Sequence, residues 1–119
     1  MSTVDHFKNS KDFQTFTAGQ VIFETGAPGG QMYAVKDGEV DIIYRDTVLD
    51  TVGPGGIFGE MGLVEGNASR SATAIARTDC QIVPVDKQRF LFLVHETPTF
   101  ALSVMQIMAH RLRRMNELI

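Results

Sequence analysis

The sequence has 119 residues, with 44% apolar and 21% charged side chains, 11 glycines and a formal net charge of -3. This length suits a single domain that closes its own core, and the acidic balance argues against a dedicated nucleic-acid binder, which normally shows a basic excess. The single Cys80 excludes an intrachain disulfide, no secretory signal is visible, and the longest uncharged run, residues 97–109, is too short to span a bilayer, so we expect a cytoplasmic protein without a membrane partner.

Short β-strands are predicted for the part of the chain from about residue 12 to 85. Turn-forming residues recur there every several positions, and the segments between them are rich in Val, Ile, Tyr, Phe and Thr. Many short strands at this spacing indicate a sandwich or a barrel. Asp37-Gly38, between two such segments, predicts a hairpin because a tight turn there needs a positive φ. The predicted strands are 13–16, 21–24, 32–35, 40–44, 48–52, 71–76 and 81–85.

Downstream of Asp86 the apolar spacing becomes that of helices. Asp86 can cap a helix over residues 87–95. Pro98 suits the first position of a second helix, over about residues 98–118, with Thr97 as its cap. Apolar residues at helical spacing in these segments are Phe90, Leu91, Val94, Ala101, Val104, Met105, Met108, Leu112 and Met115.

The segment from residue 57 to 74, IFGEMGLVEGNASRSATA, carries the chemically informative residues. A helical turn starting at Gly59 would point free backbone N–H groups outward, which favours an anion. Arg70, at the start of the next strand, can bind the same anion with its fork of donors. Glu60 would be repelled by an anion, so we expect it to accept a hydrogen bond from a neighbouring hydroxyl. These residues suit a ligand with one negative charge and an adjacent hydroxyl, such as a 3′,5′-cyclic phosphate beside a ribose 2′-hydroxyl.

FGEMGL followed by RSAT, within a glycine-punctuated β-roll, resembles the phosphate-binding cassette of the cyclic nucleotide-binding domain family. TAGQVIFETGAPGGQMYAVKDGEVDI resembles the family's first strands and hairpin, and the C-terminal helices fall where the family places its hinge and lid. The resemblance implies a mainly β fold: an eight-stranded, jelly-roll-like β-roll, a short cassette helix and two C-terminal helices. All of these would form one domain over residues 1–119.

The resemblance also implies roles for individual residues. Glu60 would bind the ribose 2′-hydroxyl, Arg70 would bind the cyclic phosphate, and Gly59 would contribute its backbone to either group. Further contacts to phosphate or ribose are expected from Met61, Ser71 and Ala72. The expected wall and lid around the base are Ile42, Leu49, Leu63, Arg111 and Met115.

Several of these residues also have a purely structural interpretation. Glu60 and Arg70 could form an ion pair across a loop, although the glycines between them would then be unexplained. Each wall residue could belong to the core alone. Arg111, together with Arg113 and Arg114, could form the solvated basic end of a helix, which the helix dipole favours.

No pattern indicates catalysis or a resident metal. The three histidines lack metal-ligand spacing, and Cys80 has no evident activating partner. The sequence contains neither of the glycine-rich motifs that bind nucleotide phosphates, G-x-x-x-x-G-K-[ST] and G-x-G-x-x-G. We therefore expect a non-catalytic sensor that binds cyclic AMP in preference to cyclic GMP and needs no cofactor. The alternative is a roll of the same fold that has lost nucleotide binding and serves as an interaction scaffold or senses another effector.

The output of such a sensor is expected to pass through another protein chain. Relatives that bind DNA continue into a helix-turn-helix, which this sequence does not contain, so we expect no DNA partner. A monomer or weak homodimer is expected because part of an apolar stripe on the last helix could remain exposed. That stripe consists of Val104, Met105, Met108, Leu112, Met115 and Ile119.

Overall fold

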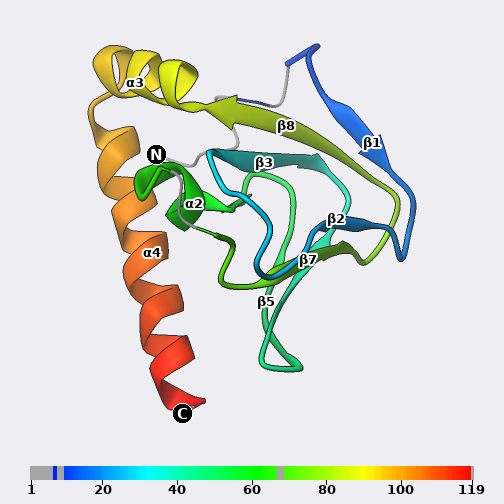
Figure 1. Ribbon diagram of the computed structural model, residues 1–119. Coiled ribbons are helices and arrows are strands. Elements are labelled where there is room, and N and C mark those ends of the chain that lie inside the picture. The colour runs from blue at the N-terminus through cyan, green and yellow to red at the C-terminus, as the bar shows by residue number, and fades with distance from the viewer. Residues whose placement is uncertain (1–6, 8–9, 67–68, 119) are drawn as a thin grey trace.

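The computed structural model describes residue 7 and residues 10–66 and 69–118, and these form a mainly β fold with C-terminal helices (Figure 1). The described residues contain eight strands in two four-stranded antiparallel sheets, which confirms the predicted fold class. The strands are β1 (Gln14–Phe16), β2 (Val21–Phe23), β3 (Gln31–Asp37), β4 (Val40–Tyr44), β5 (Thr47–Val52), β6 (Ile57–Phe58), β7 (Thr73–Ala76) and β8 (Cys80–Asp86). The helices are α2 (Glu60–Val64), α3 (Lys87–Glu96) and α4 (Thr99–Glu117).

The strand order is β1-β8-β3-β6 in one sheet and β2-β7-β4-β5 in the other. Strand β3 pairs with β8, whereas β4 pairs with β5 and β7. Since β3 and β4 do not pair with each other, the hairpin predicted at Asp37-Gly38 is wrong. The turn instead carries the chain from one sheet to the other. Gly38 has a φ of 85°, and a Cβ there would lie 2.3 Å from the carbonyl oxygen of Asp79, so this turn is pressed against the start of β8.

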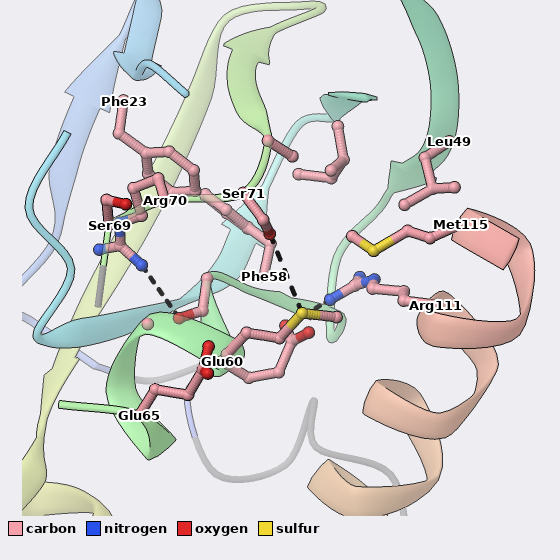
Figure 2. A pocket seen from close by; sticks show the side chains of 15 residues that line it. Phe23, Leu49, Phe58, Glu60, Glu65, Ser69, Arg70, Ser71, Arg111 and Met115 are labelled. Atoms are coloured by element: carbon pink, nitrogen blue, oxygen red, sulfur yellow. Dashed lines mark hydrogen bonds and ion pairs between the residues drawn. The ribbon is translucent and has the colours of Figure 1, made fainter. Parts of the chain in front are cut away.

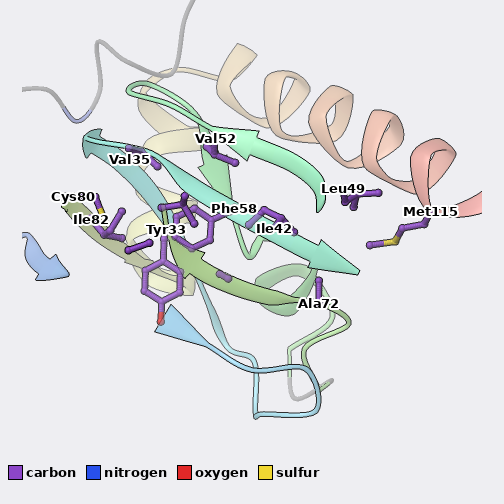
Figure 3. Packing of buried hydrophobic residues seen from close by; sticks show 13 residues of the cluster. Tyr33, Val35, Ile42, Leu49, Val52, Phe58, Ala72, Cys80, Ile82 and Met115 are labelled. Carbon is purple, nitrogen blue, oxygen red and sulfur yellow. The ribbon is translucent and has the colours of Figure 1, made fainter. Parts of the chain in front are cut away.

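Strand β3 is buried on both faces of its sheet. Residues 32–35 of β3 are all buried, and successive side chains of a strand point to opposite faces. Tyr33 and Val35 therefore enter the cluster inside the roll (Figure 3), whereas Met32 and Ala34 enter a second cluster with residues of α2 and α4. The helices thus cover the outer face of this sheet. The second cluster consists of Phe7, Met32, Ala34, Ile57, Leu63, Val83, Val85, Phe100 and Val104.

The ends of the two C-terminal helices agree only in part with the prediction. Asp86 caps α3 as expected, with its carboxylate accepting a hydrogen bond from the backbone N–H of Arg89 at 2.8 Å. Thr97, by contrast, does not cap α4 with its side chain. It ends α3, and the N-cap of α4 is Pro98, which offers no side-chain hydrogen bond. The backbone carbonyl of Thr97 accepts from Phe100 instead, at 2.9 Å.

Helix α4 lies along one side of the roll (Figure 1). Its buried residues recur every turn or two: Phe100, Val104, Arg111 and Met115. Of the predicted apolar stripe, Met105 and Leu112 are exposed, whereas Val104 and Met115 are buried. Leu102, which is not part of that stripe, is exposed as well, and Ile119 lies outside the described residues. In the portion of the chain that the structure describes, no helix is both long and apolar enough to cross a membrane.

Candidate ligand-binding site

A pocket lies between α2, the sheet that contains β4 and β5, and the C-terminal half of α4 (Figure 2). Every site residue predicted from the sequence lines it except Leu63. Leu63 lies on the opposite face of the short helix α2, where it packs into the second cluster and not against the pocket. The lining residues are Phe23, Ile42, Leu49, Phe58, Gly59, Glu60, Met61, Gly62, Glu65, Ser69, Arg70, Ser71, Ala72, Arg111 and Met115.

Arg70 is a buried cation that no carboxylate contacts among the described residues, although the charge of the buried Glu60 is near enough to stabilise it. It is 6% exposed, and within the described ranges it forms no salt bridge. Its Nη1 donates to the carbonyl oxygen of Gly59 at 3.0 Å and its Nη2 to that of Gln31 at 2.8 Å. Its Nε is buried and has no hydrogen-bond partner among the described residues. Desolvation by burial lowers the pKa of this guanidinium below its ordinary value, because burial disfavours the charged form.

Aromatic rings hold the Arg70 guanidinium from the side of the roll. Its central carbon lies 4.2 Å from the ring centroid of Phe23 and 5.8 Å from that of Tyr33, and these two rings stack on each other with centroids 6.0 Å apart. A guanidinium at such distances is attracted by the ring faces and also fits them as a plane. Sequence reasoning missed Phe23, since a single aromatic residue in a strand carries no signal that distinguishes a pocket wall from core.

The glycines of the segment allow α2 to approach Arg70 closely. A Cβ on Gly62 would lie 2.5 Å from Nη1 of Arg70, a distance that real side chains do not reach. Gly59 has a φ of 76° and would place a Cβ 3.0 Å from the same nitrogen. Only a chain without side chains at these two positions can bring the Gly59 carbonyl within hydrogen-bond distance of the guanidinium.

Glu60 pairs with Arg111 and not with Arg70. Glu60 is 2% exposed and Arg111 5%, and Nη1 of Arg111 donates to Oε1 of Glu60 at 2.5 Å (Figure 2). Nη2 of Arg111 also donates to the carbonyl oxygen of Ile57 at 2.6 Å. The alternative of a structural Glu60–Arg70 ion pair is therefore wrong, and so is a solvated Arg111. In the part of the chain that the structure describes, Oε2 of Glu60 forms no hydrogen bond.

Asp50 completes this charged group and was missed by the sequence analysis. Its Oδ2 accepts from both Nε and Nη2 of Arg111, each at 3.2 Å. The available signal was the rarity of Asp inside a strand, because its short polar side chain disfavours that conformation. Asp50 and Glu60 both contact Arg111, whereas Arg70 contacts no carboxylate among the described residues.

No described residues in this fold provide a metal site or an activated nucleophile. Among the described residues there is no group of three or more His, Cys, Asp or Glu side chains that could hold a metal ion. Burial raises the pKa of the Cys80 thiol, which keeps it protonated and a poor nucleophile. The polar groups of the pocket are the Arg70 guanidinium, which contacts no carboxylate among the described residues, and the Glu60 carboxylate, which Arg111 holds beside an apolar wall.

A buried arginine and a buried carboxylate beside an apolar wall are groups that suit a small organic anion that also carries a hydroxyl. The model of the cyclic nucleotide-binding domain matches residues 13–97 of this sequence. The chain therefore belongs to the cyclic nucleotide-binding domain family.

Three known proteins illustrate the relationship. The cAMP-dependent protein kinase regulatory subunit of Eremothecium gossypii is 38% identical over 82 residues, which cover 69% of this chain but only 18% of that protein. A structure described as "A cyclic-GMP-dependent signalling pathway regulates bacterial phytopathogenesis" has a TM-score of 0.71 and 35% identity, and covers 84% of this chain and 82% of its own. A structure described as "Sp-2Cl-cAMPS bound to PKAR CBD2" has a TM-score of 0.77 and 26% identity, over 90% of this chain and 70% of its own.

Proposed function

We propose that this chain is a non-catalytic sensor that binds a 3′,5′-cyclic nucleotide monophosphate, with cyclic AMP preferred over cyclic GMP. The observation that carries the proposal is Arg70, which is buried, has no carboxylate partner among the described residues and keeps an unpartnered Nε. A buried charge is costly unless it is paired. The cyclic phosphate, with its single negative charge, supplies the missing partner for the donors of Arg70 that the two carbonyls leave free.

Glu60 is the proposed acceptor for the ribose 2′-hydroxyl. Its Oε1 is bound to Arg111 and its Oε2 forms no hydrogen bond in the described chain, so this second oxygen can accept from a neutral donor. Gly59 and Met61 lie directly beside it in the pocket lining, and Ser71 and Ala72 line the pocket next to Arg70. These residues are the proposed contacts to ribose and phosphate.

The base is proposed to lie against the apolar part of the pocket, under α4. Ile42 and Leu49 come from the roll and Met115 from α4, and all three are buried lining residues. The preference for cyclic AMP is supported by the relative whose name includes cAMP and by the similar structure that holds Sp-2Cl-cAMPS. The similar structure described with cyclic GMP makes cyclic GMP the competitor to test.

Calorimetric titration of the protein with cyclic AMP and cyclic GMP tests the function. We expect a dissociation constant in the micromolar range or below for cyclic AMP, which corresponds to about -8 kcal/mol, and weaker binding of cyclic GMP. Linear 5′-AMP serves as the control, because its phosphate carries a second charge that Arg70 alone does not balance. If neither cyclic nucleotide binds at roughly millimolar concentration, the alternative of a roll that serves as a scaffold or binds another effector is correct.

The parent protein should discriminate strongly against 2′-deoxy cyclic nucleotides. A missing hydroxyl leaves the buried Glu60 carboxylate without its donor, and an unsatisfied buried group costs about 1–3 kcal/mol, so the affinity should fall about 5- to 150-fold. Glu60→Gln should reduce this ratio, whereas Glu65→Gln, a change of the same kind at an exposed position of the pocket, should preserve it. Equal affinity of the parent for the ribo and deoxy ligands would assign Glu60 another role.

The remaining features of the proposed sensor concern its surroundings. We propose a cytoplasmic protein whose output passes through another protein chain, since the pocket offers binding and no reaction. A monomer or weak homodimer is proposed because the exposed side chains Leu102, Met105 and Leu112 of α4 present only a narrow apolar stripe.

A further inference from the structure

Asp50 lies outside the ligand pocket and yet contacts the group that holds Glu60. It is in the middle of β5, it is absent from the pocket lining, and it borders a neighbouring groove between residues 50–57 and α4. Arg111 lines both the pocket and this groove. The guanidinium of Arg111 therefore gives Asp50 a side-chain connection to a pocket that it does not line.

The guanidinium divides its donors unequally between the two carboxylates. The edge formed by Nε and Nη2 faces Oδ2 of Asp50, with two hydrogen bonds of 3.2 Å. Only Nη1 is left for Glu60, and it donates to Oε1 alone. This arrangement matters because an arginine edge normally binds both oxygens of one carboxylate in a fork. Asp50 occupies the edge that would otherwise be free to form such a fork with Glu60.

We propose that Asp50 is a positioning residue for ribose recognition: by holding the Nε edge of Arg111, it keeps Oε2 of Glu60 free for the 2′-hydroxyl. The inference rests on the proposed function and goes beyond it, since it assigns ligand selectivity to a residue outside the pocket. Without the Asp50 charge, Glu60 is the one carboxylate that contacts Arg111 among the described residues, beside the neutral carbonyl of Ile57. Arg111 then turns its fork toward that carboxylate and competes with the ligand for both oxygens.

Asp50 is well suited to testing, because its substitution is tolerated more easily than that of the residues it positions. Its side chain is 34% exposed, whereas those of Arg111 and Glu60 are 6% and 3% exposed. Asp50→Asn keeps the size of the side chain and removes its charge. Asp46→Asn is the matched control: it removes the same charge from the exposed turn between β4 and β5, where the positive φ of 61° suits Asn.

The experiment measures the affinity of each variant for cyclic AMP and for 2′-deoxy cyclic AMP, with thermal unfolding as the check on folding. Asp50→Asn should weaken binding of cyclic AMP about tenfold and binding of the deoxy analogue much less, so that the ribo-to-deoxy ratio falls. Asp46→Asn should leave both affinities and their ratio unchanged. In an Arg111→Gln background, Asp50→Asn should cause no further change in the ratio, because its effect passes through Arg111.

The outcomes separate this inference from the function on which it rests. If Asp50 served folding alone, Asp50→Asn would weaken the binding of both ligands equally. An unchanged ribo-to-deoxy affinity ratio in the folded variant would overturn the positioning role, while the proposed function would stand. A further fall of the ratio in the Arg111→Gln background overturns the route through Arg111. If the parent binds neither cyclic AMP nor cyclic GMP, the proposed function fails and the positioning role fails with it.

Discussion

Arg70→Ala should weaken binding of the cyclic nucleotide by at least tenfold. Arg70 is the buried cation whose Nε has no partner among the described residues, so the substitution removes the charged donors that we propose bind the phosphate. A hydrogen bond to a charged group contributes about 1.5–3 kcal/mol, and about 1.4 kcal/mol corresponds to a factor of ten in affinity. Calorimetric titration of the parent and the variant measures the loss directly.

Arg70 also contributes to the packing of the pocket, and the controls must separate this effect from ligand contact. Its guanidinium joins Gly59 to Gln31 through two carbonyl oxygens and lies against the ring of Phe23. Arg70→Lys keeps the charge but loses the planar fork, so its affinity should lie between those of the parent and the alanine variant. Arg89→Ala is the matched control, because Arg89 pairs with Asp12 away from the pocket. A folded Arg70→Ala variant with parental affinity would refute the assignment of the phosphate site.

The residues from Gly59 to Ala72 could be predicted as a site because what determines their arrangement is local. The glycine spacing permits the close approach to Arg70, and both Glu60 and Arg70 lie within one short stretch of the sequence. Their lining of a common pocket therefore followed from spacing and residue type. The partner of each charge did not follow. Glu60 binds Arg111, which is 51 residues away, because the docking of α4 decides which cation reaches it.

Long-range packing also explains where the sequence analysis was wrong or silent. The turn at Gly38 has the residues of a hairpin, but the contact with Asp79 at the start of β8 directs the chain into the other sheet. Leu63 is an apolar residue of the kind that lines a pocket, but it packs into the second cluster on the other side of α2. Asp50 carries no motif at all. Its importance appears only when β5 and α4 are placed side by side, because Arg111 then bridges two carboxylates from different elements.

The second large effect is expected at Arg111, the only charged residue among the buried residues of α4. Removing one partner of a buried ion pair costs about 3–5 kcal/mol, because the remaining charge is left uncompensated. Arg111→Ala leaves the buried Glu60 carboxylate without its partner. Asp50, the other partner of Arg111, is partly exposed, so we expect the loss in the free energy of unfolding to lie toward the lower end of this range. Chemical denaturation measures it, and Arg113→Ala, at an exposed position of the same helix, should change stability by less than about 0.5 kcal/mol.

The contact between Arg111 and Glu60 also bears on how binding is converted into a signal. We propose that α4 acts as a lid, with Arg111 and Met115 closing the pocket over the base and the break between α3 and α4 serving as the hinge. A ligand shifts the position of a helix only if it binds the two positions with different affinity. The ligand meets this condition here, because it would contact side chains of the roll and of α4 at once. Amide hydrogen exchange in residues 100–118 should therefore slow when saturating cyclic nucleotide is added.

Truncation after His110 tests the same lid from the other side. The shortened chain keeps Arg70 and Glu60 but loses Arg111 and Met115, so it should still bind, with lower affinity and faster dissociation. Arg111→Ala in the full chain separates the two losses, because it removes the charge that holds Glu60 and leaves Met115 over the apolar wall. If exchange in α4 is the same with and without ligand, the helix stays docked in both states and only stabilises the fold. The Arg111–Glu60 ion pair would then be present with and without ligand. The conformational response to the ligand would have to occur in α2 or in the strands that flank it.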